Sequence, residues 1–142
     1  MWWLFVGLGC RGIQGEFVVV LESATFPDEV CPESDWGSDE SEPDASIRIE
    51  TVWDGRTWSS SVAEKGAEPV WGEPIFDGVA FSSKDLMEEG LLVTPVENDT
   101  INGDVFGTPL EGEVYVLDPE EVRAREFDVV PGCVDVIFSM ER

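Results

Sequence analysis

Short apolar runs, separated by clusters of turn-forming residues, limit what this chain can fold into more than any other feature. The runs are rich in Val, Ile, Phe and Trp, which favour strands, and the clusters between them are rich in Gly, Pro, Asp and Ser. This pattern predicts an all-β fold. The expected strands are Trp2–Leu8, Glu16–Glu22, Ser46–Val52, Arg56–Val62, Pro74–Phe81, Leu91–Glu97, Leu110–Leu117 and Cys133–Met140.

The number and length of these runs predict an eight-stranded antiparallel β-sandwich made of two sheets. At 142 residues the chain is long enough for one domain with a core and short for two. We expect residues 15–142 to form that domain, and residues 1–14 to be an N-terminal strand or a segment at its boundary. Two brief segments, Ser83–Gly90 and Pro119–Arg125, have helical character and fit crossover turns between strands.

The charge of the chain is strongly one-sided. There are 31 acidic residues against 8 basic ones and no histidine, which gives a formal net charge of −23. Such a surface repels nucleic acid and attracts cations or basic proteins. We therefore predict that the chain does not bind nucleic acid.

The three cysteines, Cys10, Cys31 and Cys133, are widely spaced, and there is no histidine to complete a zinc site with them. Their odd number disfavours a secreted disulfide framework and so predicts a reducing compartment. The apolar start of the chain, "MWWLFVGLGC", is too short to span a membrane.

Two acidic segments stand out against this background. One is "ATFPDEVCPESDWGSDESEPDAS", residues 24–46, which contains no base; the other is "LLVTPVENDTINGDVFG", residues 91–107. Taken alone, an acidic run is usually a solvated loop. In a sandwich, however, two such loops can meet at one end, where clustered carboxylates repel one another unless a cation sits between them. Calcium, which takes six to eight oxygen ligands, suits such a cluster better than magnesium, so we predict a calcium site.

Four sequence landmarks in the same order resemble the C2 domain, the calcium-dependent phospholipid-binding sandwich of synaptotagmins, protein kinase C and perforin. "GEFVVVLESATFPD" resembles the opening strand of that family, and "SEPDASIRI" its Ser-Asp-Pro-Tyr-Val strand. "AEPVWGEPIF" resembles the Asn-Pro-x-Trp-x-Glu turn, and residues 91–107 resemble the Val-x-Asp-x-Asp loop that ends in Asp-x-x-Gly. The closing "GCVDVIFSM" is similar to the last strand. The resemblance implies a C2-like Greek key from about residue 15 to residue 140.

The resemblance also implies a set of site residues. Glu97, Asp99 and Asp104 match the calcium ligands of the third loop, and Asp35 with Glu42 match those of the first loop, with Asp39 or Glu40 as second choices. Trp36 and Ile101 stand where family members insert apolar side chains into lipid. The implied cofactor is calcium, and the implied partner is an anionic phospholipid membrane.

The leading functional hypothesis is therefore a calcium-dependent membrane-binding module that targets a larger protein to membranes. An alternative is a calcium-independent C2-like domain that binds a basic protein partner through its acidic loops, and a third is an acidic decoy that mimics nucleic acid. Catalysis is not expected, because the sequence has no histidine, no nucleophile elbow and no phosphate-binding glycine loop. The expected location is the cytoplasm, peripheral at a membrane when calcium is bound, with a secreted or vesicular location left open.

Overall fold

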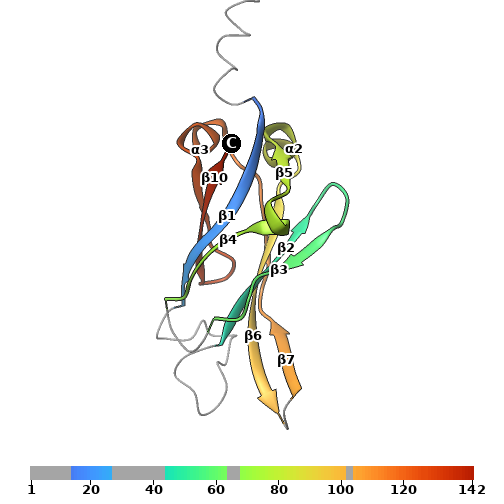
Figure 1. The fold of residues 1–142 in the computed structure, drawn as a ribbon, viewed down its shortest axis with the longest axis vertical. Helices are drawn as coiled ribbons and strands as arrows, with labels where there is room; N and C mark the ends of the chain where they lie inside the picture. Colours follow the sequence, from blue (N-terminus) through green and yellow to red (C-terminus); the bar gives the residue numbers. More distant parts are fainter. Residues whose placement is uncertain (1–13, 27–43, 64–67, 102–103) are drawn as a thin grey trace, which may run out of the picture.

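The computed structural model describes residues 14–26, 44–63, 68–101 and 104–142, and for residues 99–101 and 104–106 it describes the backbone alone. These residues form two antiparallel sheets that pack face to face (Figure 1). The prediction of an all-β sandwich is confirmed, with ten strands in the described ranges rather than eight. The expected strand Trp2–Leu8 lies outside the described residues.

The first sheet has the strand order β4-β1-β10-β9, with β5 paired to the other end of β1. Its strands are β1 (Glu16–Thr25), β4 (Val70–Pro74), β5 (Ala80–Ser82), β9 (Glu126–Val129) and β10 (Asp135–Glu141). The longest pairing in it joins β1 to β10, with a bulge between Leu21 and Ser23. The N-terminal and C-terminal strands of the described chain are therefore neighbours.

The second sheet has the order β3-β2-β6-β7, with β8 paired to β6. Its strands are β2 (Ala45–Thr51), β3 (Thr57–Ser59), β6 (Leu91–Ile101), β7 (Asp104–Pro109) and β8 (Glu113–Tyr115). The strand β6 is the longest in either sheet, with 11 residues. Because it pairs with β2, β7 and β8, it is the central strand of this sheet.

The core lies between the sheets and follows the alternation of each strand. On β10, Val136, Phe138 and Met140 are buried while Ile137 between them is exposed. Facing them from the second sheet, Ile47, Ile49 and Val93 are fully buried. Strands with this period of two bury one face each, which gives a single continuous core.

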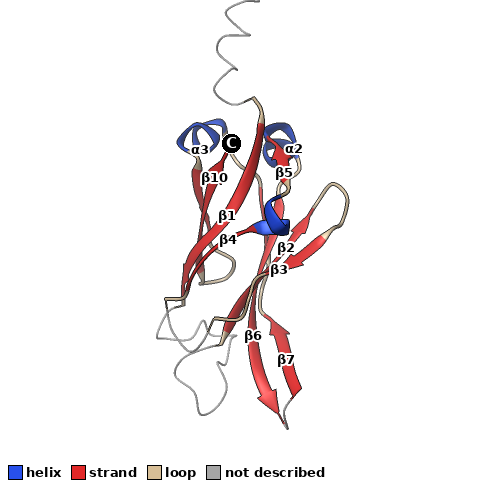
Figure 2. Ribbon diagram, viewed as in Figure 1, coloured by secondary structure: helices blue, strands red, loops and turns tan. Residues whose placement is uncertain are grey.

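Three helical segments complete the fold of the described residues, and all are short (Figure 2). Two of them, α2 (Ser83–Glu88) and α3 (Pro119–Ala124), confirm the two predicted helical segments. Ser82 caps the first helix, and Asp118 with Glu121 forms a capping box on the second. In Figure 1 both helices lie at the upper end of the sandwich, and the β6–β7 hairpin projects from the lower end.

The expected strand Pro74–Phe81 is wrong as a single strand. The structure divides this stretch into the end of β4, a turn η1 (Ile75–Gly78) and β5. Phe76 and Asp77 both have positive φ angles, 51° and 56°, so the chain cannot stay extended there. β4 and β5 thereby pair with two successive parts of β1, Val20–Ser23 and Glu16–Val18.

The other strand corrections add β7 and β9. The strand expected over Leu91–Glu97 extends further, because β6 continues to Ile101 and returns as β7 where the sequence predicted a loop. The segment Glu126–Val129, which has no counterpart among the expected strands, pairs with β10. Cys133 is disulfide-bonded, which disagrees with the reducing compartment predicted from the cysteine count, while Cys10 and Cys31 lie outside the described residues.

Candidate functional site

The β6–β7 hairpin carries three of the five predicted calcium ligands, and its register defines how they are arranged. Side chains at alternate positions of a strand share a face, and so do residues directly opposite each other on antiparallel strands. Glu97 and Asp99 are two residues apart on β6, and Ile101 is opposite Asp104. Glu97, Asp99 and Asp104 therefore lie on the same face of the hairpin, together with Ile101.

This face continues the buried face of the second sheet. Glu97 is opposite Ala45, which is fully buried, and Leu91 and Val93 on the same side of β6 belong to the core. Glu97 itself is only 5% exposed. The acids of the hairpin thus begin at the edge of the core and extend away from it toward the hairpin end.

The spacing of these residues is compatible with a shared cation. Asp99 and Asp104 occupy diagonal positions, since Asp99 is opposite Phe106, and such positions have Cα atoms about 7–8 Å apart. Glu97 and Asp99 are separated by two residues of strand, or about 7 Å.

The other members of the predicted site fall on parts of the chain that the structure does not describe. Asp35, Glu42 and Trp36, and the second choices Asp39 and Glu40, lie outside the described residues. For Asp99, Ile101 and Asp104 the backbone is described and the side chains are not. Among the side chains that are described, no three of the metal-binding types gather closely enough to hold an ion. The calcium site therefore stays a prediction.

Asn98 anchors the base of the hairpin to β2. Its side-chain amide donates to the carbonyl oxygen of Asp44 at 3.1 Å and to the hydroxyl of Ser46 at 3.0 Å, and its backbone N–H also donates to Asp44. These bonds join residues that are more than fifty positions apart in sequence. They fix where the hairpin leaves the sheet.

A second acidic region lies beside α3 and was not anticipated from the sequence. A cleft of about 470 Å³, the α3–β9 cleft, is bordered by α3, β9 and β10. Five carboxylates line it: Asp118, Glu120, Glu121, Glu126 and Asp128. Phe127 and Ile137 contribute apolar surface to the same cleft. A sequence signal was present, because the acids of Glu126–Val129 alternate with apolar residues, as in a half-buried strand.

Aromatic packing and hydrogen bonds hold one side of this cleft. Phe127 stacks on Phe138 and on Tyr115, with ring centroids 4.9 Å and 5.8 Å apart. The Tyr115 hydroxyl donates a short hydrogen bond to Glu121, and Glu121 also accepts from the backbone N–H of Asp118 at 2.9 Å. Partial burial, followed by the Glu121 carboxylate, raises the pKa of Tyr115 well above its usual range. Glu121 is therefore held in place by its neighbours.

A close pair of carboxylates, Asp128 and Asp135, lies on the outer face of β9 and β10. Asp128 is opposite Ile137, two residues from Asp135 on the same side of β10. Burial, and then the charge of Asp128, raises the pKa of Asp135. One oxygen of Asp135, Oδ1, is buried without a hydrogen-bond partner. The ionised form of Asp135 is therefore disfavoured in the folded state.

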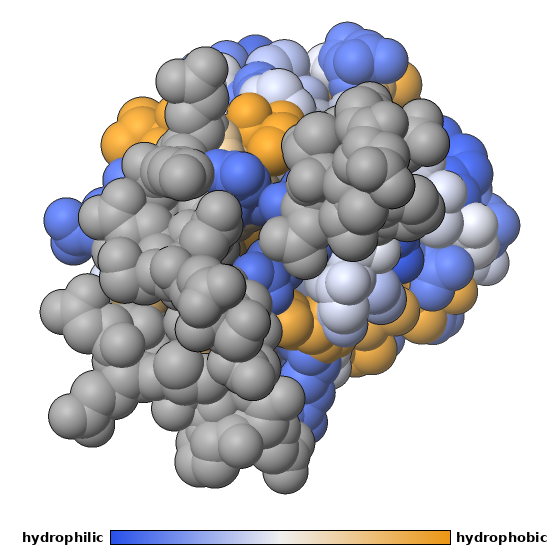
Figure 3. Space-filling model, turned by 90° about the horizontal axis from the view of Figure 1, so that it is seen from below, coloured by the Kyte–Doolittle hydropathy of each residue, from blue (hydrophilic) through white to orange (hydrophobic). Residues whose placement is uncertain are grey.

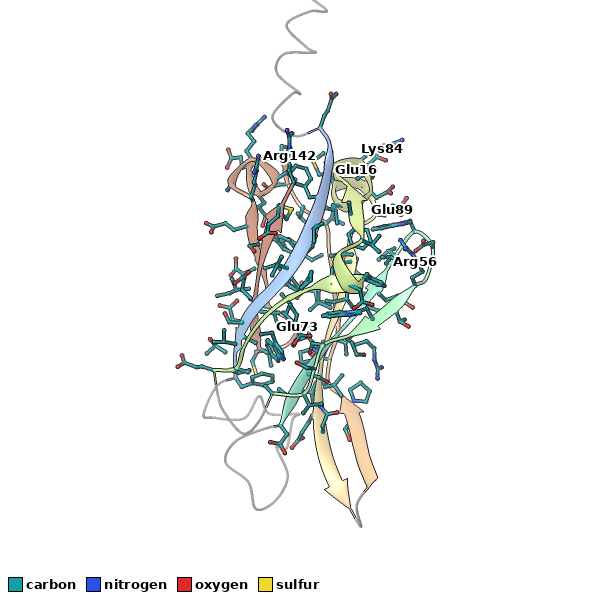
Figure 4. All side chains as sticks on the ribbon, in the orientation of Figure 1. Glu16, Arg56, Glu73, Lys84, Glu89 and Arg142 are labelled. Carbon is teal, nitrogen blue, oxygen red and sulfur yellow. The ribbon has the colours of Figure 1, made fainter. Side chains whose placement is uncertain are left out.

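None of the five carboxylates of the α3–β9 cleft forms an ion pair with a basic residue in the described part of the chain. The one ion pair found there joins Arg56 to Asp54 at 2.7 Å, on the β2–β3 turn (Figure 4). The guanidinium of Arg56 also lies over the rings of Phe76 and Phe81, at 5.6 Å and 5.8 Å. The Thr51 hydroxyl, together with Arg56, lowers the pKa of Asp54. This group is a structural unit of the turn.

Figure 3 views the molecule from the end that carries the β6–β7 hairpin. The described surface there is a mixture of hydrophilic and hydrophobic residues. No helix within the described ranges is long and apolar enough to cross a bilayer. No model of a known family and no curated protein matches this chain.

Proposed function

We propose that this chain is a C2-like module that docks on anionic phospholipid membranes when it binds calcium. The observation that carries the proposal is the register of the β6–β7 hairpin, which puts Glu97, Asp99 and Asp104 on one face. The four landmarks of the family resemblance support it further, because the segments containing them include β1, β2, β4 and the β6–β7 hairpin. No reaction is assigned to the chain.

In the proposed mechanism, Glu97, Asp99 and Asp104 would hold calcium, whose charge would offset the repulsion between the carboxylates and attract lipid phosphate. Two unit charges about 4 Å apart repel by roughly 4 kcal/mol at an effective dielectric of 20, so an empty cluster of acids strongly favours a cation. Asp35 and Glu42 are proposed to complete the ligand set from the segment between β1 and β2. Trp36 and Ile101 are proposed to enter the lipid once the charge has been neutralised.

The cellular compartment proposed for this module is inferred from its disulfide bond and not from its fold. The disulfide of Cys133 favours an oxidising compartment over the cytoplasm that the cysteine count had indicated. Calcium sites of extracellular modules are typically weak, with dissociation constants on the order of 10⁻⁴–10⁻³ M. Two glutamates in a ligand set usually made of aspartates fit such a weak site.

The alternative function is calcium-independent binding of a basic protein partner through the acidic loops. The net charge of −23 favours it, because electrostatic attraction at this scale speeds encounters with basic partners without any metal ion. The two functions differ in one respect that is simple to measure, which is whether binding to the target requires calcium.

The test is calcium titration calorimetry on the full chain under non-reducing conditions, with magnesium as the control ion. We expect saturable heat with calcium, and calcium affinity at least about tenfold weaker in the double variant Asp99→Asn with Asp104→Asn. The matched control is Glu88→Gln with Glu89→Gln, which removes two charges from the exposed surface of the opposite end. This control should bind calcium as the unaltered chain does.

Liposome sedimentation then tests the membrane step. Vesicles of phosphatidylserine and phosphatidylcholine should pull down the chain with calcium and release it on addition of a chelator. No calcium heat at millimolar concentration, or equal heat in both double variants, would overturn the calcium mechanism. Binding to a basic protein that persists in chelator would then favour the alternative.

A further inference from the structure

We propose that the α3–β9 cleft is a docking site for an extended basic segment of a partner protein, which adds to the first sheet alongside β9. This site is separate from the β6–β7 hairpin and does not rest on the calcium proposal. In Figure 1, α3 lies at the upper end of the sandwich and the hairpin at the lower end. A segment bound in the cleft therefore leaves the hairpin face free.

The first argument is the open edge of β9. In the described part of the chain, β9 is the last strand of the first sheet, with β10 on one side. The N–H of Met140 donates to the carbonyl oxygen of Arg125 at 2.9 Å, which fixes the phase of the ladder. Hydrogen-bonded pairs alternate along antiparallel strands, so Phe127 and Val129 bond to β10. The backbone N–H and C=O groups of Glu126 and Asp128 then point away from the sheet, toward the edge.

The second argument is the charge beside that edge. The two residues whose backbone groups face outward, Glu126 and Asp128, also carry their side chains on the outer face, where both are exposed. An added strand would place alternate side chains directly opposite them, and opposite charges in such positions attract. This arrangement selects a segment with Lys or Arg at every second position.

The third argument is the apolar floor. Ile137 is opposite Asp128 and is 41% exposed, so it offers apolar surface on the outer face of the sheet. Phe127 lines the cleft and is fixed by its stacking between Tyr115 and Phe138. Lys and Arg cover apolar surface with their methylene stems while their charged ends reach carboxylates. The cleft thus offers apolar surface for the methylene stem of such a side chain and carboxylates for its charged end.

The fourth argument is that the acids of the cleft are available. Arg123 and Arg125 are close in sequence, yet neither forms an ion pair within 4.0 Å in the described residues, where Arg56–Asp54 is the one such pair. Asp118 and Glu121 are committed to the capping box. Glu120 and Glu126 remain for a partner, while Asp128 interacts with Asp135 through its charge and a side-chain hydrogen bond.

The test uses a blocked heptapeptide, Lys-Thr-Lys-Val-Lys-Thr-Lys, with chelator present throughout. Its control has the same composition in the order Lys-Lys-Lys-Lys-Thr-Val-Thr, which carries the same charge without the alternation. Binding is followed by amide chemical shifts and by hydrogen exchange of the backbone. We expect the alternating peptide to bind more tightly, and to shift and protect the amides of Glu126 and Asp128 above all others.

Substitutions separate this site from general attraction to an acidic protein. Glu126→Lys with Asp128→Lys should weaken binding at least about tenfold. The matched control, Glu88→Lys with Glu89→Lys at two exposed positions where α2 ends, changes the net charge equally and should weaken binding much less. If the double lysine variant of β9 does not fold, the neutral variant Glu126→Gln with Asp128→Asn is used in its place and should also bind the alternating peptide more weakly than the unaltered chain does.

Three results would overturn the proposal: no binding of the alternating peptide, equal weakening by the two lysine pairs, or equal affinity for both peptides without protection of the β9 amides. The chelator keeps these outcomes distinct from the calcium test. Failure of the calcium site leaves the peptide result unaffected, and loss of peptide binding leaves the calorimetry unaffected.

Discussion

The β6–β7 hairpin and the α3–β9 cleft both collect carboxylates, but the chain holds them in different ways. In the hairpin, the shared face of Glu97, Asp99 and Asp104 follows from strand register alone. In the cleft, Glu121 is fixed by Tyr115 and by the capping box, above a stack of aromatic rings. One region depends on long-range pairing and the other on local contacts, so substitutions should affect them separately.

The largest effect is expected at Gly90, which lies against the backbone of Tyr115. A Cβ atom at this position would lie 2.3 Å from the carbonyl oxygen of Tyr115, and its φ angle is +84°. We expect Gly90→Ala to lower the free energy of unfolding by about 3 kcal/mol, through overpacking and backbone strain together. The measurement is the midpoint of urea unfolding.

Gly55 provides the matched control for this substitution. Its φ angle is +69°, but a Cβ atom added to it would have no neighbouring atom within 4 Å among the described residues. Gly55→Ala should therefore cost about 1 kcal/mol, from backbone strain alone. Equal losses in the two variants would mean that the close approach to Tyr115 contributes nothing.

An intermediate effect is expected at Asn98, where the hairpin leaves the sheet. Asn98→Ala removes the donors to Asp44 and Ser46 and should cost about 1–2 kcal/mol in the free energy of unfolding. Amide exchange should accelerate along β6 and β7 more than in the first sheet. Thr108→Ala, at an exposed site on β7, is the control and should change stability by less than about 0.5 kcal/mol. Uniform acceleration across both sheets would argue against a local anchor.

The smallest effect is a gain in stability, at Asp135. Its raised pKa means that the folded state binds the proton more tightly than the unfolded state does. The stability from this group is therefore present at low pH and is lost as pH rises through the folded pKa. At pH 7, Asp135→Asn should stabilise the fold by about 1 kcal/mol, since the neutral amide removes the burial of a charge and its repulsion with Asp128.

This gain should shrink in acid, where the aspartate of the unaltered chain is already protonated. Melting temperatures at pH 7 and at about pH 3.5 would show it, with Glu113→Gln, an exposed position on β8, as the control. A gain of the same size at both pH values would contradict the proposed origin in ionisation.

Much of the fold could be predicted from the sequence because its signals are local. Alternation of apolar residues predicted β1, β2, β6 and β10 to within a few residues. Pro119 and the acids after it predicted α3. The errors came where two local signals competed, as at Val70–Pro74, where Gly72 and Pro74 hid a strand.

The β6–β7 hairpin is a second place where two sequence signals competed. The family resemblance drew attention to the acids of residues 91–107 and implied a loop after Glu97. The sequence also contains the pair Asn102-Gly103 between two strand-like segments, and this pair is typical of two-residue hairpin turns. That signal indicates continued strands, and the observed pairing of Ile101 with Asp104 agrees with it. The alternation of Glu126–Val129 indicated a half-buried strand, but the cleft itself could not be predicted, because it depends on how α3 packs against β9.

The exposed edge of β9 also bears on how the protein behaves at high concentration. Open strand edges tend to pair with copies of themselves, which is a common route to aggregation. The strand β9 is short, with four residues, and Glu126 and Asp128 make its edge acidic. A second copy of the chain that approaches this edge is therefore repelled by carboxylates of the same sign. The same two side chains that would attract a basic segment thus also oppose pairing of β9 with a second copy of the chain.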